Sequence, residues 1–258
     1  MAYTVQRYGW KPDLPDHRDQ YFMAPSPATL KLPTKVDLRS KCPKTISDQG
    51  QLGSCTANAI GTAFEFGLMK QKAKAFPASR LFIYYNERKI EGTVQEDAGA
   101  MIRDGMKVVN NLGVCAETLW PYSDKNPGPF QKEPPAAVYK DARKHTATTY
   151  QRVPRTLRAM QARLSSGFPF VFGFSVYESF ESPAVSKTGE VPMPRPNEEA
   201  LGGHAVLAVG YDDDTQRFLV RNSWGRGWGN KGYFTMPYAY LLDDNLSDDF
   251  WTILAVSG

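Results

Sequence analysis

Cysteine is scarce in this chain, with three in 258 residues, at positions 42, 55 and 115. So few thiols exclude a disulfide-stapled scaffold, and their odd number leaves at least one unpaired in a monomer. Either Cys42 and Cys115 pair and leave Cys55 free, or both are buried and reduced. There is no C-x-x-C, and the three histidines are scattered, so the sequence predicts neither a metal site nor a cofactor.

Long apolar runs and blocks of one charge are also missing. No stretch approaches the roughly 18 residues needed to cross a bilayer, so no membrane partner is expected. The formal charge of +4 comes from a mixed surface rather than a basic block, which argues against a nucleic-acid partner. Residues 1–21 lack a basic segment followed by an apolar one and do not resemble a Sec signal peptide. The compartment stays open between the cytoplasm and export by another route.

The chain is nevertheless long enough, and with 41% hydrophobic residues apolar enough, to bury one large core or two small lobes. Helical periodicity dominates up to about residue 165, and short strands rich in Val, Phe, Tyr and Leu follow. Helices are expected near residues 55–68, 79–90, 98–111, 135–145 and 154–165, and strands near 168–176, 205–211, 217–221, 232–236 and 250–256. This order predicts an α+β fold of two lobes with a cleft between them.

Residues 1–31 differ from the rest of the chain in composition, with several Pro and Asp residues and no sustained hydrophobic periodicity. Such a segment is typical of an extended arm. Its aromatic residues, at positions 3, 8, 10, 21 and 22, indicate that the arm packs against something rather than extending into solvent.

Cys55 carries the most chemical information. It stands where a helical periodicity begins, and the first-turn N–H groups and the helix dipole favour the thiolate there. Gln49, six residues earlier, could donate a side-chain N–H to a tetrahedral oxyanion, with the Cys55 backbone N–H as the second donor. Taken alone, Gln49 is better explained as a turn-forming residue.

Two later segments supply what such a thiol needs. His204 follows two glycines and opens an apolar strand, and Asn222 could hold its ring in one tautomer. Trp224 could shield that hydrogen bond from water. A core histidine and an ordinary turn explain each feature separately, so the combination carries the argument: nucleophile, base and orienting amide together make an acyl-transfer site.

These segments closely resemble the papain-like cysteine peptidases. The matching stretches are DQGQLGSC at 48–55, GHAV at 203–206 and NSWGRGWGNKGY at 222–233, and VDLR at 36–39 resembles the start of their mature domain. His204 lies 149 residues beyond Cys55, a spacing typical of the family. The resemblance covers residues 33–258.

The resemblance implies a papain-like fold over residues 32–258, preceded by an N-terminal extension at 1–31. A mainly helical lobe is expected at about 45–150 and an antiparallel, β-barrel-like lobe at about 151–258, with the active-site cleft between them. The activity implied is that of a cysteine endopeptidase, acting as a monomer on peptide or protein substrates.

The same resemblance implies the roles of single residues. Cys55 would be the nucleophile, His204 the general base and later acid, and Asn222 the residue that orients His204. Gln49 and Cys55 would form the oxyanion hole, and Trp224 would support the site. Cys55 and His204 are expected to form a thiolate–imidazolium pair at neutral pH.

The chain also departs from the family pattern. Leu52 stands where a Cys is usual, so a disulfide beside the nucleophile is missing, and Thr56 replaces the usual Trp. Gln95-Glu96-Asp97-Ala98-Gly99 replaces a Gly-rich segment with its own Cys, and Gly99 is the candidate there for backbone contact with substrate. The long helical propeptide is replaced by about 30 residues, as in the short bacterial papain-like enzymes typified by xylellain.

The arm and the specificity remain open. The arm could lie in or across the cleft and limit access, or it could pack on the back of one lobe. Gly203 and Tyr240 are candidate substrate contacts, and the floor of the second subsite is expected within residues 238–244. An acidic floor would favour basic side chains, whereas Leu or Tyr would favour apolar ones. Two other classes of protein fit the motifs, a catalytically silent peptide-binding module and an acyl transferase on the same fold.

Overall fold

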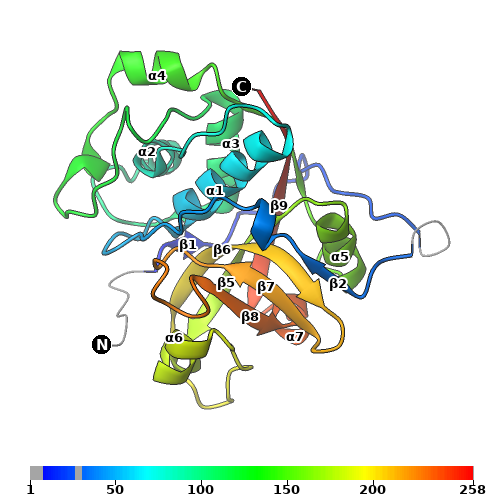
Figure 1. Cartoon of the computed structure of the whole chain (residues 1–258). Helices are drawn as coiled ribbons and strands as arrows, with labels where there is room; N and C mark the ends of the chain where they lie inside the picture. Colours follow the sequence, from blue (N-terminus) through cyan, green and yellow to red (C-terminus); the bar gives the residue numbers. More distant parts are fainter. Residues whose placement is uncertain (1–7, 27–30, 258) are drawn as a thin grey trace.

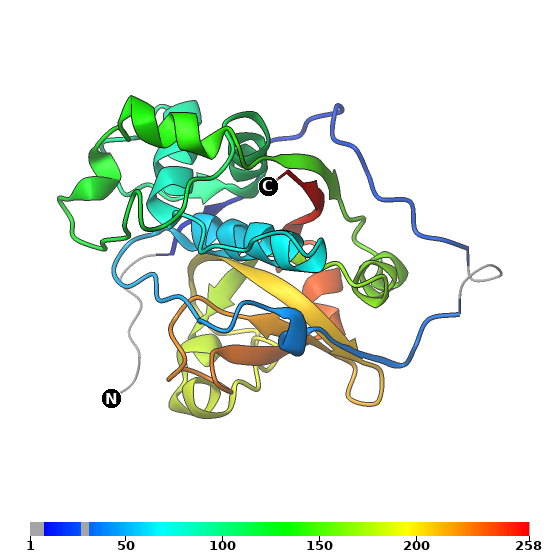
Figure 2. The same ribbon diagram turned by 45° about the horizontal axis from the view of Figure 1, so that its top comes forward.

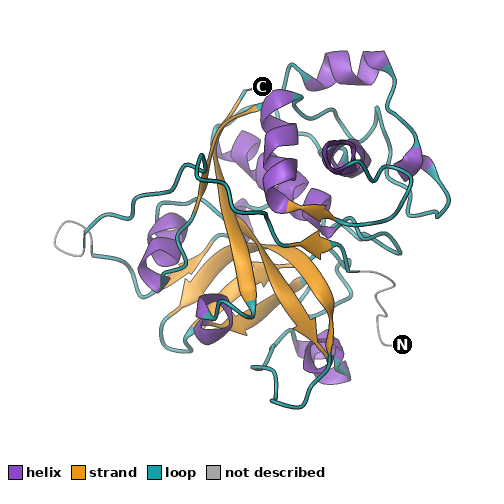
Figure 3. Ribbon diagram, turned by 180° about the vertical axis from the view of Figure 1, so that it is seen from behind, coloured by secondary structure: helices purple, strands orange, loops and turns teal. Residues whose placement is uncertain are grey.

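The computed structural model describes residues 8–26 and 31–257. Helices gather on one side of the molecule and strands on the other, with α1 between them (Figures 1 and 3). The helical side consists of α1 (Cys55–Lys70), α2 (Arg80–Glu91), α3 (Ile102–Asn111) and α4 (Ala136–Ala142). The helices α5 (Leu157–Ser165), α6 (Pro183–Thr188) and α7 (Tyr238–Leu242) accompany the strands.

One antiparallel sheet forms the other side. Its strands lie in the order β4 (Ala147–Arg152), β9 (Ser247–Val256), β5 (Phe170–Tyr177), β6 (Ala200–Asp212), β7 (Arg217–Arg221) and β8 (Tyr233–Pro237), and β2 (Lys35–Asp37) also pairs with β6. The sheet is not closed into a barrel, contrary to the barrel-like lobe expected from the sequence, because β4 and β8 lie at opposite ends of it. The edge of β4 is covered in another way: the Arg152 N–H donates to the Gln20 carbonyl at 2.8 Å.

Local sequence explains where the helices begin and end. The Ser79 hydroxyl accepts the Phe82 N–H at the start of α2, and Gly92 ends this helix in the left-handed region, at a φ of 73°. Thr156 caps α5 in the same manner, through the Ala159 N–H. Helix α1 is buried on most of its faces, because the other helices pack on one side of it and the sheet on the other.

Most of the elements expected from periodicity are present, and the strands β5 to β9 fall within a few residues of their expected bounds. Strand β4 was not predicted. Its sequence, ATTYQR, is mostly polar and so lacks the apolar alternation by which a strand is recognised. The three cysteines are free and buried, which confirms the second of the two alternatives for Cys42 and Cys115. In the described parts of the chain, no helix has the length and apolar character needed to cross a membrane.

Residues 8–26 form a segment that we call the strap. Its first part, β1 (Trp10–Lys11), pairs in parallel with β3 (Ala100–Met101) and packs against β5 and β6. The strap then crosses the edge of β4 and passes around the outside of α5 (Figure 2). Arg163 of α5 stacks over the Phe22 ring at 4.1 Å, and the Arg158 Nε donates to the Pro25 carbonyl at 3.0 Å. The other residues of the predicted arm, 1–7 and 27–30, lie outside the described residues.

Candidate active site

Cys55 is the first residue of α1 and is completely buried. The backbone N–H groups of Ala205 and Gly9 lie near its sulfur, where they oppose the rise in thiol pKa that burial causes. The first of these groups follows His204 in β6, and the second belongs to the strap. The thiol therefore lies where the helical side, the sheet and the strap meet.

His204 lies in β6 and is also completely buried. Its Nε2 is 2.8 Å from the Asn222 Oδ1, and the Trp224 ring stacks on the imidazole at 4.8 Å between centroids, with the planes 28° apart. The Nδ1 atom has no hydrogen-bond partner among the described residues. The ring is thus fixed from one side, through its Nε2.

Gln49 is buried and held in place by the residue after Asn222. The Ser223 hydroxyl donates to the Gln49 Oε1 at 2.8 Å, and the Gln49 backbone N–H donates to the Ser223 carbonyl at 2.9 Å. The Gln49 Nε2 donates one hydrogen to the Leu52 carbonyl at 3.0 Å, which leaves its second hydrogen for an oxyanion. Sequence reasoning did not foresee the part played by Ser223, although its place between Asn222 and Trp224 was a usable signal.

Burial controls the ionisation of the two central groups. It raises the pKa of the Cys55 thiol to about 12, and it lowers the pKa of the His204 imidazole to about 4 against the opposing effect of the bond to Asn222. Both shifts favour the neutral forms. With the strap in place, the expected thiolate–imidazolium pair is therefore disfavoured.

The strap covers this site with its first three described residues. The Ala100 N–H donates to the Gly9 carbonyl at 2.8 Å, and a Cβ on Gly99 would come within 2.2 Å of the same oxygen. The Tyr8 ring lies 6.1 Å from the His204 ring, and its hydroxyl donates to Glu181. Gly99, predicted as a backbone contact for substrate, thus lies against an extended segment of the chain itself.

The other two predicted substrate contacts, Gly203 and Tyr240, lie in different surroundings. Gly203 lies against Trp10 of the strap, next to His204. Tyr240 is buried, and its hydroxyl donates to the Ser175 carbonyl at 2.7 Å, behind the Phe174 ring. Asp249 of β9, outside the expected 238–244 floor, is the buried residue that receives Trp10: the indole Nε1 donates to its Oδ2 at 3.0 Å.

A buried carboxyl group lies behind the nucleophile. Thr56, the residue after Cys55, donates its hydroxyl to the Glu87 Oε2 at 2.8 Å, while the Glu87 Oε1 has no hydrogen-bond partner in the described chain. Burial raises the pKa of Glu87 to about 8. The threonine that replaces the usual Trp therefore forms a hydrogen bond between α1 and α2, inside the helical side of the molecule.

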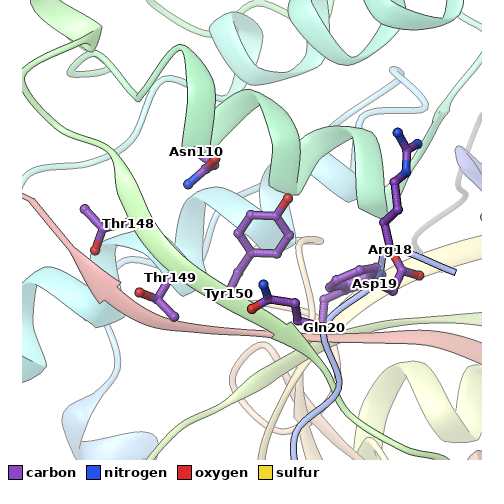
Figure 4. Close-up of a pocket in the computed structure, with 8 residues that line it drawn as sticks. Arg18, Asp19, Gln20, Asn110, Thr148, Thr149 and Tyr150 are labelled. Atoms are coloured by element: carbon purple, nitrogen blue, oxygen red, sulfur yellow. The ribbon is translucent and has the colours of Figure 1, made fainter. Parts of the chain in front are cut away.

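A separate polar cavity of about 370 Å³ has none of these residues in its lining (Figure 4). Strap residues Arg18, Asp19 and Gln20 form one of its walls, and Asn110 of α3 and the residues 148–150 of β4 form others. Because the strap supplies three of the lining residues, the cavity exists in this form only while the strap is docked.

The comparisons with known proteins agree with this geometry. Residues 32–241 match the model of the papain family of cysteine proteases. The chain is 45% identical to xylellain, a cysteine protease from Xylella fastidiosa, over 99% of this chain and 98% of that one, with a TM-score of 0.92. It is 43% identical to the uncharacterized peptidase C1-like protein L477 of Acanthamoeba polyphaga mimivirus, over 98% of this chain and 89% of the relative. Cathepsin K of Gallus gallus is 26% identical, over 79% of this chain and 58% of its own length.

The fold is accordingly a papain-like α+β fold, and the class of protein is that of the thiol-dependent peptidases. The chain belongs to the papain family of cysteine proteases. Its relatives come from a bacterium, a virus and animals, so family membership leaves its own origin open.

Proposed function

We propose that this chain is a cysteine endopeptidase whose acyl-enzyme forms on Cys55, with His204 and Asn222 completing the triad. The observation that carries the proposal is the buried set of contacts around the thiol. His204 is bonded to Asn222 beneath Trp224, and Gln49 is tied to Ser223. Each side chain is held by a second contact, which is the preorganisation that catalysis by positioned groups requires.

The first half of the reaction forms a thioester. The Cys55 sulfur attacks the carbonyl carbon of the scissile peptide, and the resulting oxyanion accepts N–H groups from the Cys55 backbone and the Gln49 side chain. His204 then gives its proton to the departing amine as the C–N bond breaks. Asn222 and Trp224 hold the imidazole in place throughout.

In the second half, His204 takes a proton from water as the oxygen attacks the thioester carbonyl. The C–S bond breaks, the acid product leaves, and the thiolate–imidazolium pair is restored. An acyl transferase would differ only in using an amine at this step, and a silent module would not form the thioester at all.

The strap determines whether substrate can reach the site in the intact chain. It covers Cys55 and His204, both of which are completely buried, and it brings the Gly9 N–H close to the sulfur. We infer that the docked strap keeps the enzyme latent, and that displacing it lets water reach the thiol and imidazole. Solvation favours the charged forms of both groups, so release would also promote the ion pair.

One experiment tests both parts of this proposal. A peptidyl epoxide directed at thiols should label Cys55 in full-length protein slowly, and labelling should be abolished in Cys55→Ser and reduced at least a hundredfold in His204→Ala. Product masses from a fluorogenic peptide, with and without added amine, separate hydrolysis from transfer. Peptide binding without labelling or turnover would identify a silent module and overturn the proposal.

A further inference from the structure

The indole of Trp10 occupies a slot lined by two glycines. A Cβ on Gly173 of β5 would lie 2.0 Å from the indole Cε2, and a Cβ on Gly203 of β6 would lie 2.8 Å from the Cε3. Any larger residue at either position would therefore displace the ring. We call Gly173, Gly203 and Asp249 the indole site. It adjoins the thiol, because Gly203 precedes His204 and Gly9 precedes Trp10.

Asp249 closes the far end of this slot. It is 1% exposed, and it holds a φ of 58°, a conformation that residues other than glycine rarely adopt. Its Oδ1 is committed to an ion pair with Arg152 at 2.8 Å. Its Oδ2 accepts two N–H groups, both from the strap: the Trp10 Nε1 at 3.0 Å and the Asp13 backbone at 2.8 Å. When the strap leaves, this oxygen loses both donors.

We propose that the indole site receives a substrate side chain, and that Asp249 makes it select an aromatic residue with a hydrogen-bond donor, Trp or Tyr, over Phe. This inference rests on the proposed peptidase function and names its substrate class. The glycine walls accept a flat ring, as Trp10 demonstrates. A substrate ring without a donor would leave the buried Oδ2 unsatisfied, and such a loss is costly for a charged acceptor.

Local charge argues against a basic side chain in the same site. The strap contributes Asp13 and Asp19 to the surrounding cluster, and both leave with it. The groups that remain are three guanidinium groups and two carboxylates: Arg103, Arg152, Arg155, Asp248 and Asp249. Because positive charge is then in excess, a further cation gains little there, whereas a neutral N–H or O–H donor satisfies the free oxygen without adding charge.

Substrate selection tests the proposal in full-length Trp10→Ala, which removes the indole from the site and weakens the docking of the strap. The substrates are acetyl-Xaa-Gly aminomethylcoumarin amides with Trp, Tyr, Phe, Leu or Arg as Xaa. We expect kcat/KM for Trp to exceed that for Phe about tenfold, from the loss of one hydrogen bond to a charged group. Adding Asp249→Asn should reduce this ratio to about threefold, because a neutral hydrogen bond is about half as strong. The matched control is Asp248→Asn, which removes a neighbouring Arg152 partner without touching the indole and should leave the ratio unchanged.

A second measurement does not depend on activity. In Trp10→Ala, 3-methylindole should raise the melting temperature, while 1,3-dimethylindole, which lacks the N–H donor, should raise it much less. Equal effects of the two indoles, a Trp-to-Phe ratio near one, or preference for Arg would each overturn the proposal. If no variant hydrolyses any amide, the proposed peptidase function fails, and the two indoles then decide alone whether Asp249 recognises the donor.

Discussion

Gly9 of the strap and Gly53, two residues before the nucleophile, are in backbone contact that no side chain could enter. A Cβ on Gly9 would lie 1.7 Å from the Gly53 carbonyl oxygen and 2.8 Å from its Cα. The opposite side of Gly9 is closed as well, since its carbonyl accepts the Ala100 N–H. The strap can therefore pass over Cys55 only where it has no side chain.

Gly9→Ala should consequently raise the basal activity of the full-length protein. A methyl group forced against backbone atoms costs about 1–3 kcal/mol, and here that cost falls on the docked strap alone. We expect about a tenfold increase in the initial rate on a small fluorogenic peptide, from a larger open fraction. Labelling of Cys55 by the peptidyl epoxide should accelerate to the same extent.

The control for this variant is Gly227→Ala. A Cβ at Gly227 meets nothing within 4 Å, and its φ is not in the left-handed region. This substitution should leave the rate unchanged. An unaltered rate in Gly9→Ala would show that the strap does not limit access.

Docking of the strap should weaken as the pH rises. Burial, helped by the neighbouring charge of Asp249, raises the pKa of Asp13 from 3.8 to about 7 in the docked state. A group with a raised pKa contributes fully to docking below about pH 4, and this contribution is lost as the pH rises toward and through 7. Between pH 6 and 8 the open fraction should increase about tenfold.

Cleavage of the strap by chymotrypsin after Trp10 measures this effect. The rate should be divided by that of Asp13→Asn, whose side chain does not titrate, so that the pH dependence of chymotrypsin itself cancels. A ratio that stays flat from pH 6 to 8 would contradict the role assigned to Asp13.

Glu87→Gln should reduce the loss in the free energy of unfolding that occurs as the pH rises from 4 to 7. The Glu87 pKa of about 8 exceeds its ordinary value of 4.5, so between pH 4 and 7 the carboxyl ionises in the unfolded chain but not in the native state, which lowers the free energy of unfolding by about 3 kcal/mol. Gln keeps an acceptor for the Thr56 hydroxyl and cannot ionise. The free energy of unfolding, measured in urea, should be similar for the two proteins at pH 4 and higher for the variant at pH 7. Glu133→Gln, at an exposed ion pair with Lys89, should show no such pH-dependent gain.

Gln49→Ala should lower kcat by a factor of 10² to 10³ with little change in KM. The substitution removes an N–H group that donates its hydrogen bond to the oxyanion of the transition state. Ser223→Ala should lower kcat about tenfold, since it removes the hydroxyl that holds the Gln49 Oε1 but leaves the donor in place. Epoxide labelling of Cys55 should persist in both variants. Equal kcat in all three proteins would exclude Gln49 from the oxyanion hole.

Local patterns were sufficient for much of the fold and for the components of the site. The apolar periodicity of α1 and the short strands after residue 168 predicted the order of elements, and the motifs that contain His204 and Asn222 predicted the contact between these two side chains. What the patterns lacked was information carried by distant contacts. Strand β4 is defined by its pairing with β9 and the strap rather than by its own polar sequence.

The same limitation explains why the sequence did not predict the role of Asp249. Its position as the end of the indole site depends on a left-handed backbone in β9, on two glycines in other strands and on Trp10, almost 240 residues away. None of these relations has a local signature. The state of the thiol was equally inaccessible, because the first-turn position predicts a thiolate, whereas burial under the strap outweighs it.

The strap is continuous in sequence with β2, which pairs with β6, the strand that carries His204. Only eight residues separate Ser26 from Lys35, so a released strap stays close to the cleft at an effective concentration in the millimolar range. The proposed inhibition of the intact chain is therefore a unimolecular equilibrium, and diluting the protein would not relieve it. A single cut in this connection converts the equilibrium into a bimolecular one, so that diluting the protein then favours release of the strap without any change in its contacts.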